Sequence, residues 1–208
     1  MRNLILSATL MVASLFGATA HAEFEAGKQY VELNNPVQIA KPGKIEVVEL
    51  FWYGCGHCYQ FESTLNPWVE QLPEDVNFVR VPALFGGMWN VHGQLFITLE
   101  AMKAEPKVHA AVFDGIHKQG KKLATPEEMA DFLASEGIDK DAFLKTYNSF
   151  GVKSQLEKAK KLAMAYQISG VPVMVVNGKY RFDIGSAGGP QQVLQVADHL
   201  IGKERASQ

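Results

Sequence analysis

The chain has 208 residues, of which 47% are hydrophobic and 20% charged, and its formal net charge is −2. This length suits one domain, or one domain with an insertion, and the composition is that of an ordinary soluble globular protein. The near-neutral charge gives no reason to expect nucleic acid or an anionic membrane as a main partner.

The N-terminal segment has the pattern of an export signal. Arg2 supplies a positive start, an apolar stretch covers residues 4–16, and Ala20-His21-Ala22 fits an A-x-A cleavage site. The alternative is a membrane anchor, but the apolar stretch is shorter than the roughly 20 residues that cross a bilayer. We therefore predict a signal peptide over residues 1–22, removed after Ala22 or alternatively after Ala20, and an exported soluble mature chain.

A β-helix-β unit is the first structure expected after this segment. Residues 45–53 (IEVVELFWY) are almost continuously apolar and rich in β-branched and aromatic residues, which predicts a central strand buried on both faces. The pattern turns helical after Cys55, and Pro67 is expected to kink or split that helix. Residues 76–81 (VNFVRV) then predict a second strand.

A block of helices follows over residues 85–167, where strand patterns are absent. The third helix opens with Thr125-Pro126-Glu127-Glu128, which combines an N-cap, a proline in the first turn and a capping-box glutamate. The expected helices cover residues 94–104, 106–118, 126–135, 140–149 and 152–167. Their apolar stripes are expected to form packed core.

Strands return near the C-terminus. Residues 173–177 and 179–184 are β-rich, and the Asn177-Gly178 pair between them predicts a hairpin. A last helix is expected over residues 190–201. The sequence therefore predicts an α/β fold in which residues 23–84 and 168–208 form one domain and residues 85–167 form an inserted helical domain.

Both cysteines lie in FWYGCGHCYQF, residues 51–61, separated only by Gly56 and His57. A zinc site usually needs four ligands and no further cysteine exists, while covalent haem attachment needs C-x-x-C-H and residue 59 is Tyr. As a structural disulfide, so short a loop would stabilise the fold by only about 2 kcal/mol. A redox-active pair in an exported chain is the remaining interpretation.

The position of Cys55 predicts the direction of the redox chemistry. At a strand end before a helix, its sulfur would face unpaired N–H groups and the positive end of the helix dipole, which lower a thiol pKa. His57 would add a donor, and Cys58, one turn into the helix, should be less exposed and act as the resolving thiol. A stabilised thiolate favours the reduced enzyme, so the disulfide should be oxidising.

Glu49 is a further candidate for the site, and the segment before the predicted hairpin has a notable proline. Glu49 stands in the apolar strand, where a buried carboxyl could exchange a proton with Cys58; the alternative is a solvent-facing residue at the sheet edge. Val171 and Pro172 precede the predicted hairpin, and a cis peptide between them is conceivable. The other histidines lack metal-ligand spacing and are expected at the surface or hydrogen-bonded, namely His92, His109, His117 and His199.

The chain resembles the DsbA family of periplasmic thiol:disulfide oxidoreductases. The resemblance covers the mature chain and is carried by GKQYVEL (27–33), VELFWYGCGHCYQFE (48–62) and GVPVMVVNGKYRF (170–182). It implies a thioredoxin fold with an inserted all-helical domain, and a redox-active disulfide with no separate cofactor and no metal. The family's low-pKa cysteine is a known instance of the effect inferred above.

The resemblance also implies roles and partners. The nucleophilic cysteine falls on Cys55, the resolving cysteine on Cys58, the intervening histidine on His57, the buried acid on Glu49, and the cis-proline loop that pairs with substrate backbone on Val171 and Pro172. It implies a periplasmic protein whose substrates are unfolded or reduced exported proteins and whose reoxidant is a quinone-linked, DsbB-like membrane enzyme. We expect a monomer that binds no nucleic acid.

One residue departs from the family pattern. The family usually has Pro-His between its cysteines, whereas this chain has Gly56-His57, the dipeptide of the less oxidising eukaryotic protein disulfide isomerase. A disulfide isomerase or reductase is therefore the first alternative to an oxidase. A second is an exported chaperone that binds unfolded chains around Phe85, Met88 and Trp89, although these side chains could equally be domain-interface core.

Overall fold

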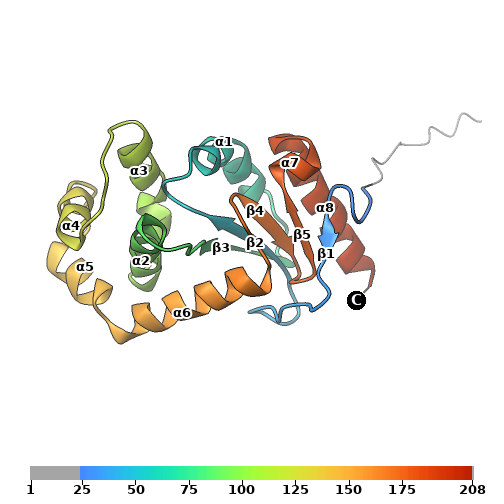
Figure 1. The fold of residues 1–208 in the computed structure, drawn as a ribbon, viewed down its shortest axis with the longest axis horizontal. Helices are drawn as coiled ribbons and strands as arrows, with labels where there is room; N and C mark the ends of the chain where they lie inside the picture. The colour runs from blue at the N-terminus through green and yellow to red at the C-terminus, as the bar shows by residue number, and fades with distance from the viewer. Residues whose placement is uncertain (1–23, 208) are drawn as a thin grey trace, which may run out of the picture.

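A five-stranded mixed sheet organises the part of the chain that the structure, a computed structural model, describes, which is residues 24–207 (Figure 1). The strand order is β1-β5-β4-β2-β3, and only β2 and β3 run parallel. The strands are β1 (Val31–Glu32), β2 (Ile45–Phe51), β3 (Val76–Pro82), β4 (Val173–Val176) and β5 (Tyr180–Asp183). The predicted signal peptide lies outside the described residues.

The central strand β2 is buried along its whole length, as predicted. Alternate residues of a strand point to opposite faces of the sheet, and here each face meets its own core. Val47 packs in a core built with α1 (Gly56–Glu70) and α8 (Pro190–Ala206), whereas Leu50 packs in the core shared with the helical block. Trp52 and Tyr53 leave the strand, which is two residues shorter than predicted, and form the turn into α1.

Five consecutive helices separate β3 from β4, as the sequence predicted, and the first four lie to one side of the sheet (Figure 1). The last of them returns along the sheet to the start of β4. These helices are α2 (Met88–Ala101), α3 (Glu105–His117), α4 (Pro126–Ser135), α5 (Lys140–Tyr147) and α6 (Phe150–Ala165). The capping prediction for α4 is confirmed, because Thr125 Oγ1 accepts from the Glu128 N–H at 3.2 Å.

Two helices depart from their predicted extents. Pro67 does not split α1, which continues through it to Glu70 although the proline removes one helical hydrogen bond. Helix α2 begins six residues before the predicted start at residue 94, because Trp89 stacks on Trp52 with ring centroids 4.1 Å apart. Tertiary packing thus extends this helix over residues whose pattern alone is not helical.

The Asn-Gly hairpin is confirmed at the junction of β4 and β5. Asn177 and Gly178 both have positive φ angles, of 51° and 65°, as a tight two-residue turn requires. Glycine is also needed for space, since a Cβ on Gly178 would lie 2.0 Å from the carbonyl oxygen of Val37. Antiparallel pairing of β4 with β2 brings the chain leading into β4, with Val171 and Pro172, beside the N-terminus of α1. The short helix α7 (Ile184–Ala187) follows β5.

None of the helices over residues 24–207 is long and apolar enough to cross a membrane.

Candidate active site

Cys55 is the N-cap of helix α1, as the sequence predicted. Its backbone N–H donates to the Trp52 carbonyl at 2.9 Å, and its sulfur accepts from the Cys58 N–H at 3.3 Å. The sulfur also lies 3.7 Å from the carbonyl oxygen of Val171 on the neighbouring loop. Both cysteines have free sulfurs in this structure, with Cys55 half-buried and Cys58 fully buried.

The surroundings of Cys55 lower the pKa of its thiol to about 6. The largest cause is a hydrogen bond from the Cys58 thiol, which stabilises the Cys55 thiolate. Partial burial acts in the opposite direction, but the backbone N–H groups of Cys58 and His57 and the charge of His57 add to the lowering. At neutral pH the Cys55 sulfur is therefore mainly thiolate, the reactive form of a cysteine.

The surroundings of Cys58 shift its thiol pKa in the opposite direction, upward. Its side chain has no exposed surface, and burial raises the pKa of its thiol, with the neighbouring Cys55 sulfur adding to the effect. Cys58 is therefore a thiol at neutral pH and must lose a proton before it can attack. The two sulfurs are close in space but differ in protonation, and Cys58 is the less exposed of the two, as predicted.

A groove lies beside the loop whose Val171 carbonyl contacts the Cys55 sulfur. It has a volume of about 440 Å³ and includes His57 on the first turn of α1 together with the loop of Val171 and Pro172. The peptide bond between Val171 and Pro172 is cis. Arg181 and Asp183 of β5 supply charged groups to the same groove. The structure thus brings His57, Val171 and Pro172 together around Cys55.

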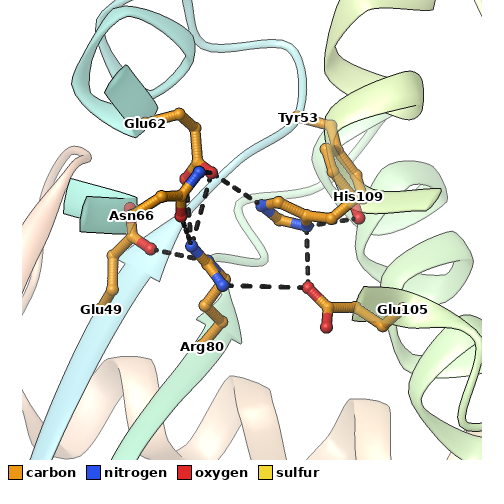
Figure 2. Close-up of polar contacts among 7 residues, drawn as sticks. All are labelled: Glu49, Tyr53, Glu62, Asn66, Arg80, Glu105 and His109. Carbon is orange, nitrogen blue, oxygen red and sulfur yellow. Dashed lines mark hydrogen bonds and ion pairs between the residues drawn. The ribbon is translucent and has the colours of Figure 1, made fainter. Parts of the chain in front are cut away.

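Glu49 is fully buried in the central strand β2 (Figure 2). Its Oε2 accepts from Arg80 Nε at 3.1 Å, while its Oε1 is buried without a hydrogen-bond partner. Burial raises the pKa of Glu49 to about 7, although Arg80 acts to lower it. The alternative of a solvent-facing position is wrong, because Glu49 stands on the central strand, covered on both faces.

Glu49 belongs to a buried set of charged residues that the sequence analysis did not identify (Figure 2). We call it the acid cluster; its members are Glu49 of β2, Glu62 of α1, Arg80 of β3, and Glu105 and His109 of α3. The parallel register places Arg80 directly beside Glu49. One signal was available, since a lone arginine inside the β-rich run 76–81 needs a buried partner.

The aromatic residues considered as a chaperone surface divide between two environments. Trp89 stacks on Trp52, the residue whose carbonyl binds the Cys55 N–H, and so belongs to the interface between α2 and the active-site turn. Phe85 packs on Trp89 with ring centroids 4.9 Å apart but keeps 45% of its surface exposed.

Over residues 24–207 no cluster of three His, Cys, Asp or Glu side chains is arranged to hold a metal ion.

Comparisons with known proteins all lead to one family. Residues 46–200 match the family described as DSBA-like thioredoxin domain. The chain is 70% identical over 208 residues to the thiol:disulfide interchange protein DsbA of Pseudomonas aeruginosa, covering 100% of this chain and 99% of the relative. It is 71% identical to DsbA of Azotobacter vinelandii over the full length of both.

Solved structures agree with this result. The crystal structure of Pseudomonas aeruginosa DsbA superposes with a TM-score of 0.86 at 71% identity, covering 88% of this chain and 96% of that one. DsbA of Xylella fastidiosa superposes with a TM-score of 0.83 at 34% identity, covering 88% and 98% of the two chains. The fold predicted from the sequence, a thioredoxin fold with an inserted helical domain, is confirmed.

Proposed function

The chain belongs to the DSBA-like thioredoxin family and is a thiol:disulfide oxidoreductase, and on this premise we propose that it donates a Cys55–Cys58 disulfide to exported proteins in the periplasm. The observation that supports this most strongly is the contrast between the two sulfurs. Cys55 is partly exposed with a pKa of about 6, and Cys58 is fully buried with a raised pKa. A disulfide whose reduced form is stabilised in this way is an oxidant.

The reaction follows from these positions. A substrate thiolate attacks the Cys55 sulfur of the oxidised enzyme, the Cys55–Cys58 bond breaks, and Cys58 leaves as a thiolate that takes up a proton. A second substrate thiolate then attacks the substrate sulfur of the mixed disulfide and displaces Cys55 as a thiolate. The substrate loses two electrons, the enzyme gains them, and the low pKa of Cys55 makes it a good leaving group.

Glu49 is proposed as the group that exchanges this proton with Cys58. Its carboxyl lies close enough to influence the pKa of the Cys58 thiol, and its Oε1 is unoccupied by any hydrogen bond. Because its own pKa is raised to about 7, Glu49 can both give and accept a proton at neutral pH. Two adjacent buried anions are costly, so a proton on Glu49 favours departure of the Cys58 thiolate.

The remaining site residues are proposed to hold the substrate. Val171 and Pro172 line the groove beside Cys55, where an extended substrate backbone could lie next to the loop. His57 borders both the groove and the Cys55 sulfur.

We propose that residues 23–84 and 168–208 form the thioredoxin-like domain, that residues 85–167 form the inserted domain, and that residues 1–22 are a removed signal peptide.

Turnover requires a reoxidant, which we propose to be a quinone-linked membrane enzyme of the DsbB type. We also propose that the protein is a monomer.

The proposed function is tested by oxidative refolding of a reduced multi-cysteine protein, with thiol trapping to follow the redox state of Cys55 and Cys58. An oxidase loses its disulfide as the substrate gains one, whereas an isomerase acts with the pair reduced.

Replacing Gly56 with Pro is expected to lower the Cys55 pKa below its present value of about 6 and to make the disulfide more oxidising. Gly56 is the first residue of α1, where proline fits best, and the N–H groups that bind the Cys55 sulfur come from His57 and Cys58. The substitution therefore removes flexibility without removing a donor.

The measurement is a pH titration of thiolate absorbance together with the equilibrium constant against glutathione. Gly56→Ala serves as the control, since a Cβ there meets no atom within 4 Å but leaves the backbone free to move. If Gly56→Pro moves neither quantity, or moves both in the less oxidising direction, the dipeptide does not tune the site through helix rigidity.

A further inference from the structure

We propose that His109, on helix α3 of the inserted helical block, is a positioning residue for thiol exchange. It keeps a proton between Glu62 and Glu105 and thereby sets the pH at which Glu49 exchanges its own proton with Cys58. This inference rests on the proposed roles of Cys55, Cys58 and Glu49.

The His109 ring lies between two carboxylates that come from different helices (Figure 2). Its Nε2 is 3.5 Å from Glu62 Oε2 on α1, and its Nδ1 is 2.9 Å from Glu105 Oε1 on α3. Neither His109 Nε2 nor Glu105 Oε1 makes a regular hydrogen bond. The main interaction between His109 and the two carboxylates is therefore charge attraction. An imidazole with an acid at each nitrogen is best satisfied when both nitrogens carry protons.

His109 is surrounded by charged and titratable side chains from several elements. Charged or titratable groups face it from α1 (Glu62), from its own helix (Glu105), from β3 (Arg80), from β2 (Glu49) and from the turn before Cys55, where Tyr53 Oη is 3.0 Å from Nδ1. Glu100 of α2 interacts with Glu105, since burial and then the charge of Glu105 raise the Glu100 pKa. Burial alone would lower the pKa of His109, but Glu105 and Glu62 outweigh burial and raise it.

The charges of the acid cluster balance only when it holds two protons. With three ionised glutamates, Arg80 and a neutral His109, the cluster would carry two uncompensated negative charges in a buried site, which is costly. One proton on His109 and one on a glutamate make the cluster neutral. Glu62 accepts from Asn66 at 2.8 Å and faces both cations, and its pKa is lowered, so it stays ionised.

Glu49 is the glutamate that takes the second proton. It is the most deeply buried of the three, and its Oε1 has no partner that favours the ionised form. The charge on His109 determines how tightly that proton is held, because each additional positive charge in the cluster favours ionised Glu49. A helix of the inserted domain thus takes part in the acid–base chemistry of Cys58.

The experiment follows oxidation of the reduced enzyme by glutathione disulfide, using acid quenching and mass spectrometry. In the first step the Cys55 thiolate attacks glutathione disulfide, forms a mixed disulfide and releases one glutathione thiolate. In the second step Cys58 gives its proton to Glu49 and attacks the Cys55 sulfur, which releases the second glutathione. The enzyme loses two electrons, and the rate of the second step is measured against pH.

We expect substitutions around His109 to move this pH profile in opposite directions. His109→Gln removes a positive charge, so the midpoint of the second step should rise by about one pH unit and the rate below it should fall about tenfold. Glu105→Gln removes a negative charge, so the midpoint should fall. In a Glu49→Gln background, His109→Gln should leave the profile unchanged, because the two residues act through one proton.

His92→Gln is the matched control. His92 is also buried, its Nε2 is 3.0 Å from the Lys122 carbonyl oxygen, and no carboxylate is among the groups that shift its pKa, so its loss should not move the profile. The proposal is overturned if His109→Gln and Glu105→Gln move the midpoint in the same direction or not at all, or if the His109 effect persists without Glu49. Failure of the first step at Cys55 would instead contradict the proposed function.

Discussion

Replacing Cys58 with Ser is expected to turn the short-lived mixed disulfide at Cys55 into a stable complex. In the native enzyme Cys58 lies one helical turn from Cys55, and the two sulfurs are close enough to interact directly. A group held in this way reacts as if at a concentration far above that of any thiol in solution. Its loss should therefore lengthen the lifetime of the mixed disulfide on the order of a thousandfold or more.

The lifetime is measured with reduced Cys58→Ser protein and glutathione disulfide, by mass spectrometry of samples quenched over time. Cys55→Ser is the matched control and should form almost no mixed disulfide, because Cys58 has no exposed surface and a raised thiol pKa. Rapid loss of glutathione from Cys58→Ser, or ready labelling of Cys58 in Cys55→Ser, would contradict the assigned order of the two cysteines.

Replacing Arg80 with Leu is expected to destabilise the native fold by about 3–5 kcal/mol, as removal of one partner of a buried ion pair does. Arg80 Nε is 3.1 Å from Glu49 Oε2, and its Nη2 donates to Asn66 at 2.7 Å and to Glu62 at 3.4 Å. Without Arg80, the acid cluster would hold three glutamates and only His109 as a cation. The free energy of unfolding is measured by urea denaturation.

The loss of stability caused by Arg80→Leu should grow as the pH rises. Glu49 already has a folded-state pKa of about 7 against an ordinary value of 4.5, and loss of Arg80 would raise it further. A carboxyl with a raised pKa leaves stability intact below its unfolded pKa and lowers stability as pH rises through the folded value. The Arg80→Leu protein should therefore be closer to the native stability at pH 5 than at pH 8.

Two variants serve as controls for this prediction. Arg80→Lys keeps the charge, but the lysine cannot reach Glu49, Glu62 and Asn66 together. Its loss of unfolding free energy should therefore lie between that of Arg80→Leu and zero. Arg205→Leu removes an exposed arginine paired with Asp75 and should change stability little. A cost at pH 8 no larger than that of Arg205→Leu, or a larger cost at pH 5, would show that the cluster does not depend on Arg80.

Sequence patterns correctly predicted those strands, helix starts and turns whose structure is determined by residues close together in the chain. The strand Ile45–Phe51 was predictable because a run covered on both faces must be apolar throughout, and the N-cap position of Cys55 followed from the change of period after it. The hairpin at Asn177 and Gly178 followed from turn chemistry. The cysteine pair could be interpreted because both redox sulfurs lie within one helical turn.

The acid cluster could not be predicted in the same way. Its members are spread from Glu49 to His109, and they meet only after β2, β3, α1 and α3 have packed together. No local period relates them, apart from Glu105 and His109, which lie four residues apart on one helix. His109 therefore looked like one of several scattered histidines. For a similar reason β1, two residues long and held only by pairing with β5, gave no recognisable pattern.

The central claim, that the Cys55–Cys58 disulfide is donated to other proteins, is tested most directly by oxidative refolding. A reduced, unfolded multi-cysteine protein is mixed with the oxidised enzyme without other oxidants, and native product is measured together with the thiols of Cys55 and Cys58. We expect one substrate disulfide to form for each enzyme disulfide consumed, and none with Cys55→Ser. Equal recovery with the native enzyme and with Cys55→Ser, or recovery while Cys55 and Cys58 stay oxidised, would contradict the claim.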